Sequence, residues 1–328
     1  VDTFAYGVSR ADGLFYPSEV GLQFCEDRET LDRTHEWRTW HNMQSLIQRG
    51  LDPLTVLIDR AHEKDMEFIA SLRMGAYGGM DPEHAVANGG GGFLHQEVRD
   101  HQLAVLEELA TEYEVEGVEL DFAASPGGSP FWLRPDEMAA NTELMTDFVR
   151  EASRRIRGRQ GSPAQVGLRV YPTEALNLKT GLDVRTWLRE GLVDFIVPML
   201  YLDFILDANM PMDWLVEAAH AVDASVYGML QPYRFNESRR FHRPENASPE
   251  MMRAAAANFW ALDVDGLYTW FLPWPLGDTE RSTLTELGDA GRVEEADKHY
   301  FLRRRCDDAE DYDYPANLPL EIPSAEPG

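Results

Sequence analysis

Residues 115–122, Val-Glu-Gly-Val-Glu-Leu-Asp-Phe, constrain the fold of this chain most strongly. Side chains alternate between the two faces of a strand, so Val118 and Leu120 share one face while Glu119 and Asp121 share the other. Helical sequence on both sides indicates a parallel sheet covered by helices, which places both acids inside a barrel. We predict that this strand delivers its acids to the end where barrel enzymes carry their chemistry. A surface strand whose acids face water is the alternative.

Strand-like and helix-like runs alternate along the chain, as in a parallel sheet whose strands are joined by helices. The expected strands are residues 3–9, 66–74, 115–122, 165–171, 193–201, 225–231 and 264–271. Amphipathic helices are expected over residues 52–64, 98–113, 141–157, 184–190, 212–222 and 249–262. Pro53 and Pro249 follow N-cap residues, and Gly191 stands where a helix C-cap is expected. The predicted fold is an α/β protein of the (β/α)8 TIM-barrel type.

A closed barrel of this type has eight strands, one more than the sequence supplies. We expect the missing first strand upstream of Val1. A doubly wound open sheet is the competing fold, but its first strand leads into a Gly-rich phosphate-binding turn, and no expected strand here is followed by G-x-G-x-x-G. Residues 89–92 are four glycines that follow a loop, so we interpret them as a flexible connection. Nucleotide binding is therefore excluded, and no cofactor is expected.

The composition indicates one large domain with an appended tail. The chain has 328 residues, of which 44% are hydrophobic. We expect a glycosidase-like barrel over residues 1–299 and an extended tail or linker, rich in proline and acids, over residues 300–328. A further domain upstream or downstream is open.

The charge restricts the partners of this chain. Acidic residues outnumber basic ones by 57 to 30, which gives a formal net charge of −27 and argues against nucleic acid or an anionic membrane as a partner. No apolar run is long enough to span a bilayer, so we expect a soluble protein. Secretion and a periplasmic location are both left open.

Polar and aromatic residues collect at the ends of the expected strands. On the inward face we place Arg73, Glu119, Asp121, Arg169, Tyr171, Tyr201, Asp203, Gln231 and Trp270. Carboxylates, planar hydrogen-bonding groups and aromatic rings together suit a sugar, whose hydroxyls need polar partners and whose ring faces stack on indole. A buried ion pair with an acid is the equally open alternative for Arg73 and Arg169.

Two loops carry further aromatic residues to the same rim. Residues 123–132 form a connection that is longer than necessary and ends in Trp132, and Trp274 follows the last expected strand. Long loops at this rim commonly shape a cleft, so both tryptophans are candidates for substrate binding. A hydrophobic seal that packs against the barrel is the alternative for both.

Residues 117–122, Gly-Val-Glu-Leu-Asp-Phe, resemble the fourth-strand motif of the bacterial glycosyl hydrolase-like family 10 barrels, and the similarity in alternation extends over about residues 1–290. The resemblance implies a barrel that acts on a glycosidic bond, with Asp121 as the strand-four acid. Residues 199–203, Met-Leu-Tyr-Leu-Asp, are similar to the strand-six Met-x-Tyr-Asp pattern of chitinase-like barrels, with one residue inserted. The chain lacks the D-x-x-D-x-D-x-E run of those enzymes, and Gln231 stands where retaining barrels carry a strand-seven acid.

Glycoside hydrolysis normally requires two carboxyl groups on either side of the scissile bond. Asp121 is the first candidate, Asp203 its expected partner, and Glu174 the reserve. Two other functions stay open. One is a carbohydrate-binding barrel without catalysis, and the other is a lyase or isomerase that uses Arg73 and Arg169 to hold an acidic sugar.

Other catalytic chemistries lack their sequence signatures. No G-x-S-x-G or H-E-x-x-H motif occurs, and His62 and His220 are interpreted as packing residues, so no metal is predicted. Cys25 and Cys306 are too few and too distant in sequence for a disulfide scaffold, and we expect two unpaired thiols.

Overall fold

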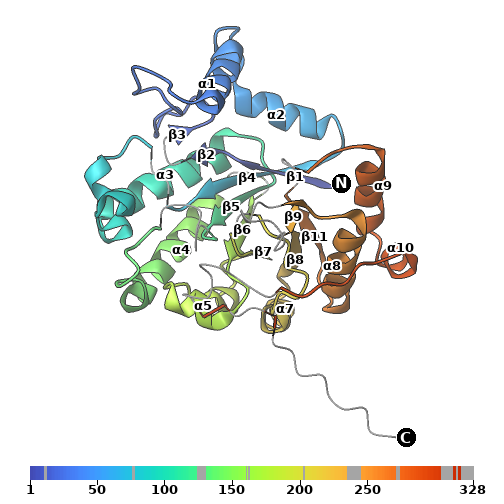
Figure 1. The fold of residues 1–328 in the computed structure, drawn as a ribbon. Helices are drawn as coiled ribbons and strands as arrows, with labels where there is room; N and C mark the ends of the chain where they lie inside the picture. The colour runs from blue at the N-terminus through green and yellow to red at the C-terminus, as the bar shows by residue number, and fades with distance from the viewer. Residues whose placement is uncertain are drawn as a thin grey trace, which may run out of the picture.

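A computed structural model describes residues 1–10, 13–75, 78–123, 131–159, 161, 163–201, 204–234, 245–270, 274–303, 313–314 and 317–318. Its main feature is a seven-stranded parallel sheet in the order β1-β4-β5-β6-β7-β8-β11 (Figure 1). The strands are β1 (Thr3–Gly7), β4 (Glu67–Arg73), β5 (Gly117–Asp121), β6 (Gln165–Val170), β7 (Phe195–Pro198), β8 (Ser225–Leu230) and β11 (Gly266–Thr269). All seven expected strands are therefore confirmed, and the fold is an α/β half-barrel of the TIM-barrel type.

The sheet is strongly curled. Arg169 on β6 donates a hydrogen bond at 2.9 Å to the hydroxyl of Tyr268 on β11, although β7 and β8 lie between these strands in the sheet order. Such a bond requires the sheet to bend back on itself, as the strands of a barrel do. Within the described residues no ladder joins β1 to β11, so these two strands form the free edges of the half-barrel. An eighth strand upstream of Val1 stays a prediction.

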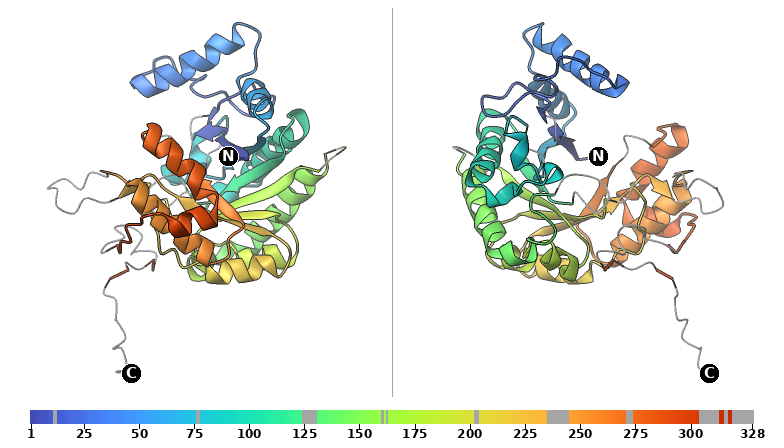
Figure 2. Two further views of the ribbon diagram at one scale, coloured as in Figure 1. Left: turned by 90° about the vertical axis from the view of Figure 1, so that its right-hand side faces the viewer. Right: turned by 60° about the vertical axis from the view of Figure 1, so that its left-hand side comes forward.

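The helices cover the outer side of the curled sheet, and Figures 1 and 2 show them ranged around it from α2 to α9. Their bounds are α1 (Thr34–Ile47), α2 (Pro53–His62), α3 (Gln96–Glu112), α4 (Thr142–Arg157), α5 (Glu174–Lys179), α6 (Val184–Arg189), α7 (Asp213–His220), α8 (Pro249–Ala261), α9 (Asp278–Leu287) and α10 (Ala290–Glu295). Two short antiparallel ladders join β2 (Ser9–Arg10) to β3 (Gly13–Leu14) and β9 (Tyr233–Arg234) to β10 (Glu245–Asn246).

The predicted helix ends have the expected capping geometry. Asp52 accepts hydrogen bonds from the backbone N–H groups of Leu54 and Thr55, at 2.7 and 3.3 Å, and Pro53 is the first residue of α2. Ser248 caps α8 in the same way through the N–H of Met251 at 3.3 Å. Each cap satisfies backbone donors that the first helical turn leaves unpaired.

Four helices, α1, α5, α9 and α10, were not predicted. They bury few side chains: Glu36 and Met43 in α1, and Thr283 and Leu287 in α9, while Trp37 in α1 is 52% exposed. The helices α5 and α10 have six residues each, which is too short for a helical period to be recognised in the sequence.

The alternation of β5 sorts its residues as predicted. Val118 and Leu120 are wholly buried in the main hydrophobic cluster, whereas Glu119 and Asp121 are buried among polar partners. The interior row below Asp121 also requires a residue without a side chain. A Cβ atom on Gly167 would lie 2.0 Å from the ring of Phe195, which fills that space. Glycine on β6 thus allows an aromatic ring on β7 to pack inside the half-barrel.

Part of the C-terminal tail packs against the domain. Tyr314 is buried, and its hydroxyl donates a hydrogen bond to Asp207. The same carboxylate accepts from Arg303 at 2.9 Å. Most of residues 300–328, including Cys306, lies outside the described residues, so the expected thiol state of the cysteines is not tested. None of the described helices combines the length and apolar character needed to cross a membrane.

Candidate functional site

The register of the central strands brings three predicted residues into one row. Arg73 on β4 pairs with Asp121 on β5, and Asp121 pairs in turn with Arg169 on β6. Adjacent strands in a sheet lie about 4.8 Å apart, so side chains on the same face of such a row can touch. The row lies at the C-terminal ends of β4 and β5, where functional groups of parallel barrels converge.

Arg169 is the centre of a buried ion-pair network. Its guanidinium donates to both Glu119 and Asp121, with the Nη1 atom 3.2 Å from Asp121 Oδ2, and to the hydroxyl of Tyr268. The arginine and the two acids are each less than 10% exposed. The two carboxylates pair with this buried guanidinium, although Arg169 Nε and Glu119 Oε2 are buried without a hydrogen-bond partner among the described residues. The geometry therefore agrees with the ion-pair alternative for Arg169, and contact of Arg169 with a substrate stays a prediction.

Glu119 lies below Asp121 on the same face and is completely buried. The Ser71 hydroxyl donates to its Oε1 atom at 2.5 Å, and Arg169 donates to the same oxygen. Burial raises the pKa of Glu119 above its usual range, and the nearby Asp121 raises it further, against the opposing effects of Arg169 and Ser71. This carboxyl group has no exposed surface in the structure, and its role in substrate binding stays a prediction.

Asp121 and Arg73 lie closer to solvent. The Asp121 Oδ1 atom accepts from the backbone N–H of Ala123 at 3.1 Å, and Oδ2 lies 3.9 Å from Arg73 Nε. The Arg73 side chain keeps 25% of its surface exposed, whereas the Arg169 side chain keeps 5%. Arg73 is therefore the arginine of this pair that a ligand can reach.

Aromatic rings stand beside the charged row. The guanidinium of Arg73 lies 5.7 Å from the ring centroid of Tyr201, and that of Arg169 lies 5.3 Å from the ring of Trp270. Tyr201 and Trp270 are half-buried and contact each other edge to face, with 6.5 Å between their centroids. The predicted set of two arginines, Asp121 and two aromatic rings is thus brought together.

Tyr268 belongs to this site but was missed in the sequence. Its hydroxyl accepts from Arg169, and burial, followed by the charge of Glu119, raises its pKa. The signal was present, because Tyr268 precedes Trp270 by two residues and alternation places both on one face.

Four other predicted binding residues are buried in the structure, and their contact with a substrate stays a prediction. Trp132 is wholly buried and packs on Phe122 with 5.2 Å between ring centroids, and Trp274 donates from Nε1 to the carbonyl of Ala247 at 3.0 Å. Tyr171 and Gln231 are also buried, and Gln231 donates to the Leu200 carbonyl at 3.2 Å. The burial of both tryptophans favours the hydrophobic seal over a stacking surface.

Of the two further candidate acids, only Glu174 is described, and it is not joined to the Asp121 network. Glu174 is the first residue of α5 and forms a two-pronged ion pair with Arg185, at 2.6 and 3.0 Å. Hydrogen bonding from Arg185 lowers the pKa of Glu174. Asp203 lies outside the described residues, two positions after Tyr201 in the sequence. Both catalytic assignments stay predictions.

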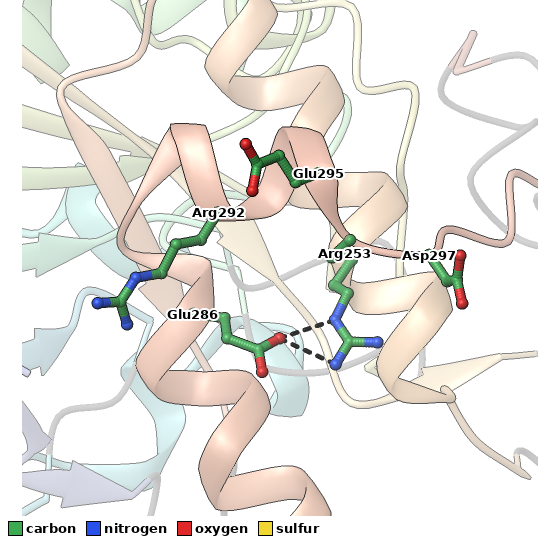
Figure 3. Close-up of a pocket in the computed structure, with 6 residues that line it drawn as sticks. Arg253, Glu286, Arg292, Glu295 and Asp297 are labelled. Atoms are coloured by element: carbon green, nitrogen blue, oxygen red, sulfur yellow. Dashed lines mark hydrogen bonds and ion pairs between the residues drawn. The ribbon is translucent and has the colours of Figure 1, made fainter.

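A surface depression of about 470 Å³ lies between α8, α9 and α10 and shares no residue with the Asp121 site. Figure 3 shows that its charged side chains come from these helices and from Asp297 just after α10, and that Arg253 faces Glu286, with which it forms an ion pair at 2.9 Å. Small-molecule sites are concave and mostly apolar with a few polar groups. This charged depression lacks that character, so the strand ends remain the better candidate.

Comparison with solved structures agrees with the fold. The C-terminal domain of a candidate chitinase from Desulfitobacterium hafniense DCB-2 matches with a TM-score of 0.50 and 10% identity, over 89% of this chain and 90% of that domain. A chitinase from Bacteroides thetaiotaomicron matches at 0.49 and 16% identity, over 76% and 83% of the two chains. At these identities the likeness concerns the fold alone.

The spore cortex-lytic enzyme SleL of Bacillus megaterium QM B1551 matches at a TM-score of 0.40 and 18% identity, over 66% of this chain. The match spans 48% of SleL, so this chain spans about half the length of that enzyme. No protein-family profile and no curated protein sequence matches the chain.

Proposed function

We propose that this chain is a glycoside hydrolase, related to the glycosyl hydrolase-like family 10 barrels, that cleaves a poly- or oligosaccharide at the C-terminal ends of its strands. One observation carries the proposal. Asp121 stands at the end of β5 beside Arg73, with the rings of Tyr201 and Trp270 next to the two arginines. A carboxylate flanked by donors and aromatic faces suits a sugar ring that must be both stacked and hydrogen-bonded.

The proposed roles follow from accessibility. Arg73, Tyr201 and Trp270 are partly exposed and would bind the sugar, while Asp121 would face the anomeric carbon as one of the two required carboxyl groups. Glu119 and Arg169 would orient Asp121, because Glu119 lies below it, Arg169 lies beside it on the neighbouring strand, and Arg169 bonds to both acids. We assign the second carboxyl group to Asp203, which follows Tyr201 in the loop after β7, with Glu174 as the reserve.

The test is release of reducing ends from neutral, uronic and sulfated polysaccharides by the native chain and by Asp121→Asn. Loss of a carboxylate that takes part in the chemistry should lower kcat by roughly 10²- to 10⁴-fold. Asp263→Asn is the matched control, because Asp263 is exposed, has φ near 63°, which asparagine tolerates, and precedes β11 at the other end of the sheet. Its activity should equal that of the native chain.

A carbohydrate-binding barrel without catalysis is the second candidate. It is favoured by the complete burial of Glu119 and by the pairing of Asp121, which is itself 5% exposed, with Arg169. Glycan binding by the native chain without turnover would replace the hydrolase proposal with this one. Eliminative cleavage of a uronic substrate, detected as an unsaturated product, would instead support a lyase that uses Arg73.

A further inference from the structure

Away from the Asp121 row, the connection between β4 and α3 brings two histidines and a glutamate together. His84 ends the short 3-10 helix η1 (Pro82–His84), His95 precedes α3, and Glu97 lies in its first turn. One potential ligand atom from each lies within 4.8 Å of the other two. The His84 and His95 rings lie 4.4 Å apart between centroids, and His84 Nε2 is 3.3 Å from Glu97 Oε1.

The four-glycine run allows the chain to bring these residues together. A Cβ atom on Gly90 would lie 2.1 Å from the carbonyl oxygen of Glu83, and one on Gly91 would lie 3.1 Å from His95 Nε2. Only glycine permits such close backbone approaches at Gly90. The run predicted to be a flexible connection is therefore packed against η1 and His95, and this close packing defines the positions of both histidines.

An ion pair alone does not account for His84. Its Nδ1 atom is buried and has no hydrogen-bond partner among the described residues. Buried polar atoms in proteins are nearly always partnered, since an unpaired one costs about 1–3 kcal/mol. An ion bound by this cluster would give the His84 imidazole a further partner, either in its present orientation or after the ring rotates.

We propose that His84, His95 and Glu97 bind a divalent cation of the zinc type. Two imidazoles and one carboxylate form a typical donor set for Zn²⁺, with a fourth position for water. Zinc–ligand bonds of about 2.0–2.1 Å in a tetrahedral arrangement separate neighbouring ligand atoms by about 3.3 Å, so modest side-chain rotation would complete the site. Glu97 is exposed and both histidines are half-buried, which gives the ion access.

The site would fix the rim of the half-barrel. The backbone N–H of Phe93, between the two histidines in the sequence, donates to the Trp132 carbonyl at 2.7 Å. The β4–α3 connection is thereby linked to the chain that follows β5, and a bound ion would restrain both. This inference does not depend on the proposed hydrolase activity.

Two other histidines make a suitable contrast. His62 pairs with Glu116 and His220 with Asp265, each at 3.1 Å, and each acid also accepts a backbone N–H from a neighbouring strand. Within the described part of the chain, neither pair has a third ligand. His220→Ala therefore removes a histidine–carboxylate pair without affecting the proposed metal site.

The experiment is calorimetric titration of the chelator-treated full chain with Zn²⁺, comparing the native chain with His84→Ala, His95→Ala, Glu97→Gln and His220→Ala. We expect one ion per chain, a loss of affinity of roughly tenfold or more in the first three variants, and no change in His220→Ala. Mg²⁺ should bind weakly, because it prefers oxygen ligands.

Circular dichroism checks that each variant is folded. Because Glu97 is exposed, Glu97→Gln should fold normally, so it tests the site even if a histidine variant does not fold. The visible absorption of bound Co²⁺ gives a second measurement of the same coordination. Absence of stoichiometric Zn²⁺ binding by the native chain would overturn the proposal, and so would affinity that Glu97→Gln and His95→Ala leave unchanged.

Discussion

Acidic residues at the two ends of the half-barrel have different partners. At the N-terminal ends of the strands, Glu116, Asp194 and Asp265 each accept a backbone N–H of a neighbouring strand at 2.7 Å. Each also pairs with a basic side chain, which is His62, Arg157 or His220, and the side chains of the three acids are 35–40% exposed. These acids connect neighbouring strands, and each has a backbone N–H and a basic side chain as its partners.

At the C-terminal ends, Glu119 and Asp121 share a single buried arginine. Their side chains are 0% and 7% exposed, and Arg169 bonds to both. At the C-terminal ends, the cost of removing the charges from water dominates the free energy of the ion pairs. At the N-terminal ends, water screens the charges. The comparison teaches that the same residue type joins neighbouring strands at one end and belongs to a buried ion-pair network at the other.

Removal of Arg169 should produce the largest effect. Arg169→Met leaves two buried carboxyl groups without their shared cation, and we expect a loss of about 3–5 kcal/mol in the free energy of unfolding. Urea denaturation measures it. The triple variant with Glu119→Gln and Asp121→Asn should recover much of this loss, because no unpaired charge remains. A loss below about 1 kcal/mol in the single variant would mean that the network is not buried in solution.

Asp194→Ala at the opposite end should have a smaller effect. The change removes the acceptor of the Val166 N–H and the partner of Arg157, and we expect a loss of about 1–2 kcal/mol. The kcat of any measured activity should remain that of the native chain. A large fall in kcat without loss of stability would contradict the separation between the two ends.

The pH dependence of the free energy of unfolding should show the raised pKa of Glu119. Burial raises the pKa of Glu119 in the folded chain above its unfolded value, so the folded state binds more protons. Its contribution is fully present below the unfolded pKa and is lost as the pH rises through the folded pKa. The slope cannot exceed about 1.4 kcal/mol per pH unit for one proton.

Glu119→Gln should remove this slope, which denaturation at a series of pH values from about 4 upward would detect. The variant should therefore gain stability relative to the native chain as the pH rises. Equal pH profiles for the two proteins would show that Glu119 does not titrate differently on folding.

Much of the half-barrel could be predicted because its strands and helices follow local periodicity. Apolar alternation identified all seven strands, and Asp52 and Ser248 indicated the starts of α2 and α8. The helix α1 was missed, and its apolar residues Trp40, Met43 and Ile47 pack in a small cluster separate from the main core. The row of Arg73, Asp121 and Arg169 was predictable for the same reason as the strands, since alternation fixes which side chains share a face.

By itself, the sequence determined the order of elements, the inward face of each strand and the candidate acid Asp121, because these depend on spacing along the chain. Only the tertiary structure decided that Arg169 pairs with two buried acids and that Trp132 and Trp274 are buried in the core. It also decided that His84 lies close to His95 and Glu97. Those outcomes depend on how far the sheet curls and how closely loops pack. Such distances arise from contacts between segments remote in sequence, so local pattern does not encode them.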